Sequence, residues 1–281
     1  MGVRDLIRRH QGYVISVPAF LWQFLFLFLP FLIVIVASVY SRFSGFTIQF
    51  YGELFTVAHF DIIFRSLLLA FINAFFCMVI AYPVAYFVSF RARRWKNLLV
   101  FLLTLPFWVN FLVHVYSWFF ILERNGLLNK FLLGLHVIRE PLHLMNSLFA
   151  VTLVMFYVYL PFMVLPIYVI FEKFDWRLIE ASLDLGAGKR ETFWHVTFPL
   201  TLSGAQLGFF LVLGMSFGEF IIPQLLNGGK SFFVGTLISD YFIVSRNLAT
   251  GSAFTCLSAI MIMAFMFVCY LIFRLIKRSA K

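Results

Sequence analysis

The sequence is poor in charged residues, and this scarcity excludes a soluble protein. Only 12% of its 281 residues are Asp, Glu, Lys or Arg, whereas 63% are hydrophobic and 40 are phenylalanine. A soluble domain carries about a quarter of its residues as charged side chains. One water-soluble core has no room for so many phenylalanines, so lipid must surround much of the surface. The composition therefore predicts one integral membrane domain over residues 1–281.

Cysteine and catalytic motifs are also scarce. Cys77, Cys256 and Cys269 each fall inside an apolar run, so they predict packing rather than disulfides or a metal site. The six histidines form no HExxH motif, and the sequence has no serine elbow and no pair of acids within the apolar runs. We therefore expect no enzymatic activity, cofactor or metal.

What the sequence does have is six long runs without Asp, Glu, Lys or Arg. Each exceeds the roughly 20 residues that a helix needs to cross the hydrocarbon, and all are too long for barrel strands of about 10 residues. The sequence therefore predicts an all-α integral membrane fold of six transmembrane helices. The expected spans are about residues 14–40, 64–90, 97–122, 145–171, 200–224 and 249–275.

The basic residues indicate the orientation of these spans. The net charge of +10 is spread over short clusters between the apolar runs, not along one polar face, which argues against nucleic-acid binding. With the amino terminus inside, the cytoplasmic segments hold fifteen Lys and Arg and the outer segments six. Cytoplasmic loops carry this excess, so both termini are expected inside. The first run has 31 uncharged residues, too many for the roughly 7–15 of a signal peptide, so a retained helix is expected.

Prolines and glycines punctuate the expected spans. Pro83, Pro161 and Pro166 are expected to bend the second and fourth helices. Two small-residue faces, Gly204-x-x-x-Gly208 and Gly214-x-x-x-Gly218, would let the fifth helix approach a neighbour closely.

The loop over residues 172–199 is long for a membrane protein and has helical periodicity. Leu178, Ala181 and Leu185 fall on one side, and the glycines that follow, beginning with Gly186, end the helix. A second short amphipathic piece follows, until Pro199 opens the next span. Such a helix–glycine–helix element is suited to docking on another protein, with an ordinary surface helix as the alternative.

The same loop resembles the EAA motif of ABC importer permeases. The motif's pattern is Glu-Ala-Ala, three residues, Gly, nine residues, then Ile-x-Leu-Pro, and the spacing matches throughout. The sequence departs from it at Ser182, Val196 and Phe198, by small or apolar changes. The resemblance implies the type I ABC importer permease fold, with a cytoplasmic coupling helix that docks on a separate ATPase subunit. It places the coupling role on Glu180, Ala181, Ser182, Asp184, Gly186 and Pro199.

Further segments resemble the permeases of spermidine/putrescine importers. They are Leu-Leu-Thr-Leu-Pro-Phe-Trp-Val-Asn at 102–110, Leu-Pro-Phe-Met-Val-Leu-Pro at 160–166, Leu-Asp-Leu-Gly-Ala at 183–187 and Gly-Glu-Phe-Ile-Ile-Pro-Gln-Leu-Leu-Asn-Gly-Gly at 218–229. This resemblance implies a polyamine substrate delivered by a periplasmic binding protein. It also implies an ATPase dimer and a second, homologous permease as partners in a bacterial inner membrane.

Glu219 is the one acid embedded in an expected span, about 28 Å from the cytoplasmic start of its helix. An acid in a membrane is by default a functional hypothesis, and a buried carboxylate needs a cationic partner to stay ionised. Glu219 therefore either lines a cation path or extends to the outer interface.

A polar stripe on the third span has two interpretations. It either faces the solute path or makes hydrogen bonds between helices, and Asn73 in the second span carries the same ambiguity. With the flanking aromatic residues, the stripe comprises Asn110, His114, Ser117, Trp108, Trp118 and Tyr116.

Two other classes remain as alternatives. A secondary transporter driven by an ion gradient would need acids in several spans. An ABC permease for another small solute, such as an amino acid, a sulfate-like anion or ferric iron, would share the coupling loop, although an anion path would prefer buried Lys or Arg.

Overall fold

The computed structural model describes residues 17–41, 45–92 and 94–279. The start of the first expected span and the basic segment 1–10 lie outside the described residues. The chain divides into two compact units, one of residues 1–59 with 238–260 and one of residues 60–237 with 261–281.

Five described helices are long and apolar enough to cross a membrane, and a bent pair of helices supplies a sixth if it is counted as one span. The bent pair is Lys96–Trp108 with Phe111–Gly134, which meet at 93°. The all-α membrane fold expected from the sequence is thus confirmed. The five long helices are Val17–Val39, Val57–Arg91, Leu148–Glu172, Lys189–Phe217 and Leu248–Arg278.

In the first unit, hydrogen bonds hold the short elements to the long helix. The Tyr51 hydroxyl donates to the Ser38 hydroxyl at 2.9 Å. The elements of this unit are η1 (Phe24–Phe28), α2 (Leu29–Val39), β1 (Tyr40–Ser41) paired antiparallel with β2 (Gly45–Phe46), α3 (Gln49–Leu54), η5 (Asp240–Val244) and the first turns of α14 (Leu248–Ser279).

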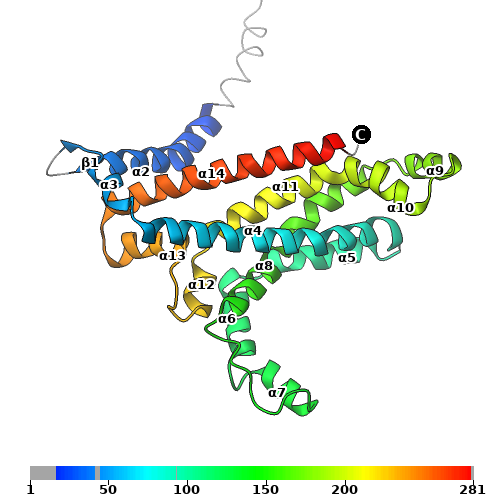
Figure 1. Cartoon of the computed structure of the whole chain (residues 1–281), viewed down its shortest axis with the longest axis horizontal. Coiled ribbons are helices and arrows are strands. Elements are labelled where there is room, and N and C mark those ends of the chain that lie inside the picture. The colour runs from blue at the N-terminus through cyan, green and yellow to red at the C-terminus, as the bar shows by residue number, and fades with distance from the viewer. Residues whose placement is uncertain (1–16, 42–44, 93, 280–281) are drawn as a thin grey trace, which may run out of the picture. The chain divides into compact units, whose positions relative to one another are not determined.

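The second unit contains most of the helices (Figure 1). In chain order they are α4 (Val57–Tyr86), η2 (Phe87–Arg91), α5 (Lys96–Thr104), η3 (Leu105–Trp108), α6 (Phe111–Leu122), α7 (Leu127–Gly134), α8 (Leu148–Glu172), α9 (Arg177–Asp184), α10 (Lys189–Thr192), η4 (Phe193–Thr197), α11 (Phe198–Phe217), α12 (Ile221–Leu226), α13 (Val234–Ser239) and the later turns of α14.

The α8–α11 pair forms the centre of this unit. A Cβ added at Gly204 would lie 2.8 Å from the Pro166 carbonyl oxygen, and one at Gly208 would lie 2.8 Å from the Met163 sulfur. The first small-residue face therefore packs directly on α8, where only glycine leaves room for the backbone. The second face does not act as one surface, because Gly214 approaches Met266 of α14 whereas Gly218 ends the helix.

The structure corrects the expectation of one continuous helix over residues 97–122. The chain passes from α5 through the 3₁₀ turn η3, which contains Pro106, and then turns at Val109 before α6 begins. Pro106 has no N–H to continue the hydrogen bonds of α5, and Val109, with φ −94° and ψ 142°, then leaves the helical conformation. The Asn110 side chain starts the new helix by accepting a hydrogen bond from the Leu112 N–H at 2.9 Å.

Two boundaries of the fifth span also differ from expectation. The expected span 200–224 is interrupted, because α11 ends at Phe217 and the separate α12 follows. At the other end, α10, the π turn η4 and α11 form one helix over Lys189–Phe217, so Pro199 does not begin a new element. A π turn just before a proline accommodates the missing N–H of the proline, so the helix continues without a break.

Candidate functional site

The loop between α8 and α11 contains a tight glycine turn. Gly186 follows α9 (Arg177–Asp184) and has a φ of +88°. Residues that carry a β-carbon rarely adopt this left-handed backbone conformation. The Gly186 N–H donates to the Leu183 carbonyl at 2.9 Å, and the Ala187 N–H donates to the Ser182 carbonyl at 3.2 Å. These two bonds form a Schellman motif, which satisfies the free carbonyls at the end of α9.

Side-chain hydrogen bonds fix α9 against α10. The Ser182 hydroxyl lies 3.0 Å from the buried Thr192 hydroxyl. Glu191 caps the start of α10 by accepting from the Gly188 N–H at 3.0 Å. Serine at the third position of the motif therefore has a partner that alanine would lack. The two short helices and the glycine turn form one braced element.

The outer face of α9 presents apolar side chains to the surroundings. Leu178 and Leu185 lie on one side of the loop helix and are exposed, Leu185 at 89%. The motif residues Glu180, Ala181 and Asp184 are exposed on the same short helix. Figure 1 shows α9 and α10 projecting beyond the ends of α8 and α11. An exposed apolar stripe on a braced, projecting helix is typical of a docking surface.

An aromatic cluster joins this loop to the spans. The Phe90 ring lies 4.8 Å from the Trp176 ring, and the Tyr82 ring lies 5.3 Å from that of Phe171. The Tyr82 hydroxyl also lies 2.6 Å from the Thr201 hydroxyl of α11. The cluster therefore packs the base of the loop against α4, α8 and α11. Its members are Tyr82, Tyr86, Phe90, Phe171, Phe174, Trp176, Phe193 and Phe198.

Glu219 lies in the break between α11 and α12. One carboxylate oxygen accepts hydrogen bonds from the Ile221 and Ile222 N–H groups at 2.9 and 3.3 Å, and the other accepts one from the Tyr159 hydroxyl. Glu219 thus caps a short helix and is tied to α8, while its side chain stays partly exposed. Close packing of Gly235 secures the break, because an added Cβ there would lie 2.6 Å from the Glu219 carbonyl oxygen.

Asn73 makes a hydrogen bond between two helices. Asn73 is fully buried, and its amide donates to the Ser216 hydroxyl at 2.8 Å. This bond joins α4 to α11 inside the protein.

Only some residues of the polar stripe on the third span lie close together in the structure. His114 lies between the Pro106 carbonyl at 3.3 Å and the Tyr157 hydroxyl at 3.4 Å. Ser117 is exposed, but its hydroxyl bonds back to the carbonyl of Val113. The Trp118 ring lies 5.4 Å from the Tyr157 ring. A polar and aromatic strip therefore lies between α6 and α8, consisting of His114, Trp118 and Tyr157.

Trp108 and Tyr116 lie outside this strip as it is defined here and are exposed, at 81% and 47%. Tyr157 and Tyr159 are the residues that the sequence patterns miss. Aromatic residues are frequent throughout these spans, so only contact with His114 and Glu219 distinguishes the two tyrosines. Their position just before Pro161, in an otherwise apolar run, is the signal that sequence alone offers.

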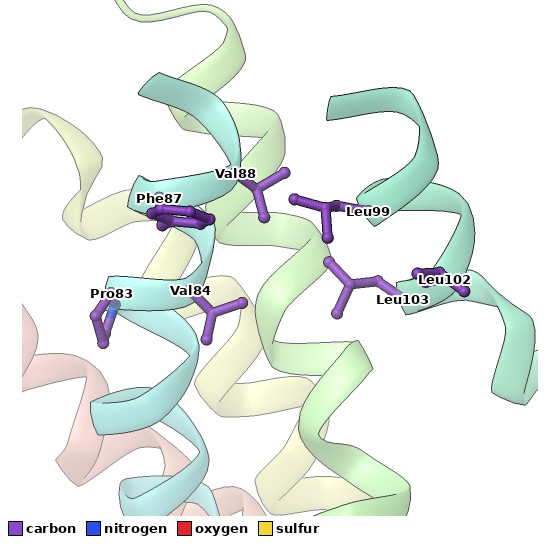
Figure 2. Close-up of a pocket in the computed structure, with 7 residues that line it drawn as sticks. All are labelled: Pro83, Val84, Phe87, Val88, Leu99, Leu102 and Leu103. Carbon is purple, nitrogen blue, oxygen red and sulfur yellow. The ribbon is translucent and has the colours of Figure 1, made fainter. Parts of the chain in front are cut away.

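One apolar crevice is lined by none of the residues of this polar strip. It has a volume of about 440 Å3 and lies between α4, η2 and α5. Figure 2 shows that every side chain lining it is apolar, with Leu99 and Leu103 facing Val84 and Val88. Such a surface suits lipid or a packed neighbour and offers no partner for a charged solute.

Comparison with known proteins assigns these features to one family. Residues 78–281 match the family described as "Binding-protein-dependent transport system inner membrane component". The spermidine/putrescine transport system permease protein PotB of Haemophilus influenzae is 35% identical over 268 residues, covering 93% of this chain and 94% of the relative. PotB of Escherichia coli K12 is 36% identical over 255 residues, covering 89% and 92%.

A further relative carries no named solute. The inner membrane ABC transporter permease protein YdcU of Escherichia coli K12 is 31% identical over 223 residues, covering 74% of this chain and 70% of the relative.

Solved structures share the fold. A bacterial ABC transporter involved in the import of the acidic polysaccharide alginate matches with a TM-score of 0.79, covering 97% of this chain and 98% of that chain. Its complex with an alginate pentasaccharide-bound periplasmic protein matches with a TM-score of 0.77, covering 95% of each chain. Both are 14% identical, so the similarity establishes the fold and nothing about the solute. The expected ABC importer permease fold is confirmed.

Proposed function

Because the chain belongs to the binding-protein-dependent transport system inner membrane components, and is a permease subunit of an ABC importer, we propose that it admits a polyamine of the spermidine and putrescine kind. The observation that carries this proposal is the 35–36% identity to permeases named for these solutes, over about nine-tenths of both chains. The solved alginate importer shares the fold but is named for an acidic solute. Side chains, rather than the fold, therefore have to select the charge of the solute.

The side chains along the proposed path fit an organic cation. Carboxylates and aromatic faces bind ammonium groups, and Glu219 and the strip of His114, Trp118 and Tyr157 offer both. Tyr159 and the start of α12 hold the Glu219 carboxylate in one orientation, and its partly exposed side leaves room for an ammonium group.

Basic side chains within α4 and α5 offer little to an anion. Arg65 is paired with Asp61 at 2.8 Å, and Lys96 is paired with Glu172 at 2.5 Å. This pairing favours a cationic solute over the anionic alternatives.

We further propose that α9 docks on a separate ATPase subunit and transmits its motion. The exposed face of α9 would fill a groove on that subunit, and the Schellman turn and the Ser182–Thr192 bond would keep the helix rigid. Because α10, η4 and α11 form one helix, any rotation of the loop would move α11 directly. The aromatic cluster would carry the same motion to α4 and α8.

The complete transporter would then work by alternating access. A periplasmic binding protein would deliver the polyamine outside, a second homologous permease would complete the cavity, and an ATPase dimer would switch it. In this arrangement both termini of the chain are cytoplasmic.

The test of the solute is uptake of labelled putrescine and spermidine by cells with and without this gene. We expect uptake that requires the gene and cellular ATP but survives collapse of the proton gradient. Absence of gene-dependent uptake would reject the polyamine. Loss on gradient collapse alone would instead favour a secondary transporter.

Replacing Glu219 by glutamine is expected to raise the KM for spermidine roughly tenfold, since one hydrogen bond to a charged group contributes about 1.5 kcal/mol or more. Glutamine keeps an oxygen for the Ile221 N–H, so the fold should persist. The measurement is initial uptake at a saturating concentration of binding protein.

The Tyr159→Phe variant is the matched control, because it removes the positioning hydroxyl and keeps the charge. It should raise the KM less than Glu219→Gln does. An unchanged KM and rate in Glu219→Gln would remove Glu219 from the path.

A further inference from the structure

A narrow apolar groove runs along the second unit between α4, α11 and α14. Its floor is formed by buried side chains, including Leu202, Ala205 and Phe273, and its rims by exposed ones such as Val79 and Ile272. Its volume is about 340 Å3. Every lining side chain is apolar except Tyr82, whose hydroxyl is already bonded to Thr201, and Cys269, whose thiol is buried. The groove therefore suits a hydrocarbon occupant and excludes a polyamine.

The dimensions of the groove match one lipid chain. Along α4 it extends from Phe71 to Tyr82, about 16 Å at the helical rise. One leaflet of a bilayer has a hydrocarbon thickness of about 15 Å, half of the full core.

One end of the groove carries the features of a membrane surface. Lys277 follows the lining residue Phe273 by one turn of α14, and Arg278 comes next. Both basic side chains are exposed. In η4 the exposed Trp194 precedes the lining residue Phe198 of α11 by one turn, and tryptophan is enriched at the lipid interface. Basic side chains at this level attract anionic headgroups.

We propose that this groove binds one acyl chain of an anionic phospholipid, with the phosphate group next to Lys277 and Arg278. The lipid belongs to the leaflet at the basic end of α14. It would fill the space between α11, which is continuous with the loop helix α10, and the neighbouring helices α4 and α14. The site is separate from the solute path and from the docking face of α9.

The test uses the assembled transporter in bilayers that contain phosphatidylglycerol or phosphatidylcholine with a diazirine in the middle of one chain. After illumination, mass spectrometry locates the lipid adducts. We expect adducts on the groove segments 202–209 and 269–276, at least about fivefold stronger for phosphatidylglycerol, because each nearby basic residue adds roughly that factor. The double variant Lys277→Gln and Arg278→Gln should remove this preference and keep the labelling.

Two further variants test the groove itself. Val79→Trp places an indole in the groove and should reduce both kinds of adduct at these segments at least about fivefold. Phe64→Trp, on an exposed face of α4 outside the groove, should leave them unchanged. Equal labelling by the two lipids, full labelling of Val79→Trp, or adducts that join the groove to another protein subunit would each overturn the proposal.

Discussion

Replacing Gly186 by proline is expected to reduce ATP-driven uptake by about 100-fold or more while the protein still inserts in the membrane. Gly186 has φ +88°, and its N–H donates to the Leu183 carbonyl. A proline ring holds φ near −65° and has no N–H, so the Schellman turn cannot form. A penalty of about 3 kcal/mol corresponds to roughly a 100-fold loss of the native loop. The measurements are solute uptake and binding-protein-stimulated ATP hydrolysis by the reconstituted complex.

Gly188 provides the matched control, because it is the next glycine in the same loop. Its φ of −69° suits any residue, and an added Cβ would meet only the Glu191 carboxylate at 3.8 Å. Gly188→Ala should therefore transport normally. Normal uptake in Gly186→Pro would show that the turn, and with it the proposed coupling, is dispensable.

Replacing Gly204 by leucine is expected to separate α8 from α11 and to lower the melting temperature of the solubilised protein by about 5–10 °C. Even the Cβ would lie 2.8 Å from the Pro166 carbonyl oxygen and 3.1 Å from the Ile167 Cα, so backbone must shift. Overpacking a close contact costs about 1–3 kcal/mol, and each kcal/mol lowers the melting temperature of a protein of this size by about 2–4 °C. Thermal unfolding followed by size-exclusion chromatography measures the shift.

Gly214→Ala is the comparison variant, since its Cβ would meet only the flexible end of Met266 at 3.2 Å. That side chain can move, so the melting temperature should change by no more than about 2 °C. Equal shifts in the two variants would contradict a close contact specific to Gly204.

These two sites account for different properties of the protein. Gly204 and Gly208 let α8 and α11 pack as a rigid pair. Gly186 sets the direction of the loop at the end of α9, the helix proposed to receive the motion of an ATPase subunit. Because α11 is continuous with α10, the packed pair and the loop form one connected body. A change of orientation in the loop is therefore expected to reach the α11–α12 break, where Glu219 lies.

The sequence also predicted several features incorrectly, each for a local reason. The apolar run 97–122 has no charge to mark an interruption, yet Pro106 and the Asn110 cap divide it into two helices. Pro199 predicts the start of a helix, yet the π turn before it lets the helix over Lys189–Phe217 continue. Asn110 and Asn73 are polar residues in apolar surroundings, and each satisfies a structural hydrogen bond. Polarity alone cannot separate such bonds from a solute path.

The sequence by itself determined the class of the protein, because long uncharged runs can be stable only as helices in lipid. It also determined the helix–glycine–helix form of the loop proposed to couple to an ATPase, because its glycines, apolar period and motif spacing act within a few residues of one another. Tertiary structure alone decided which polar residues face one another. Tyr159 reaches Glu219, Tyr157 meets His114, and Ser216 pairs with Asn73, each across separate helices. No local pattern encodes such pairs, because the packing of distant helices sets which side chains meet.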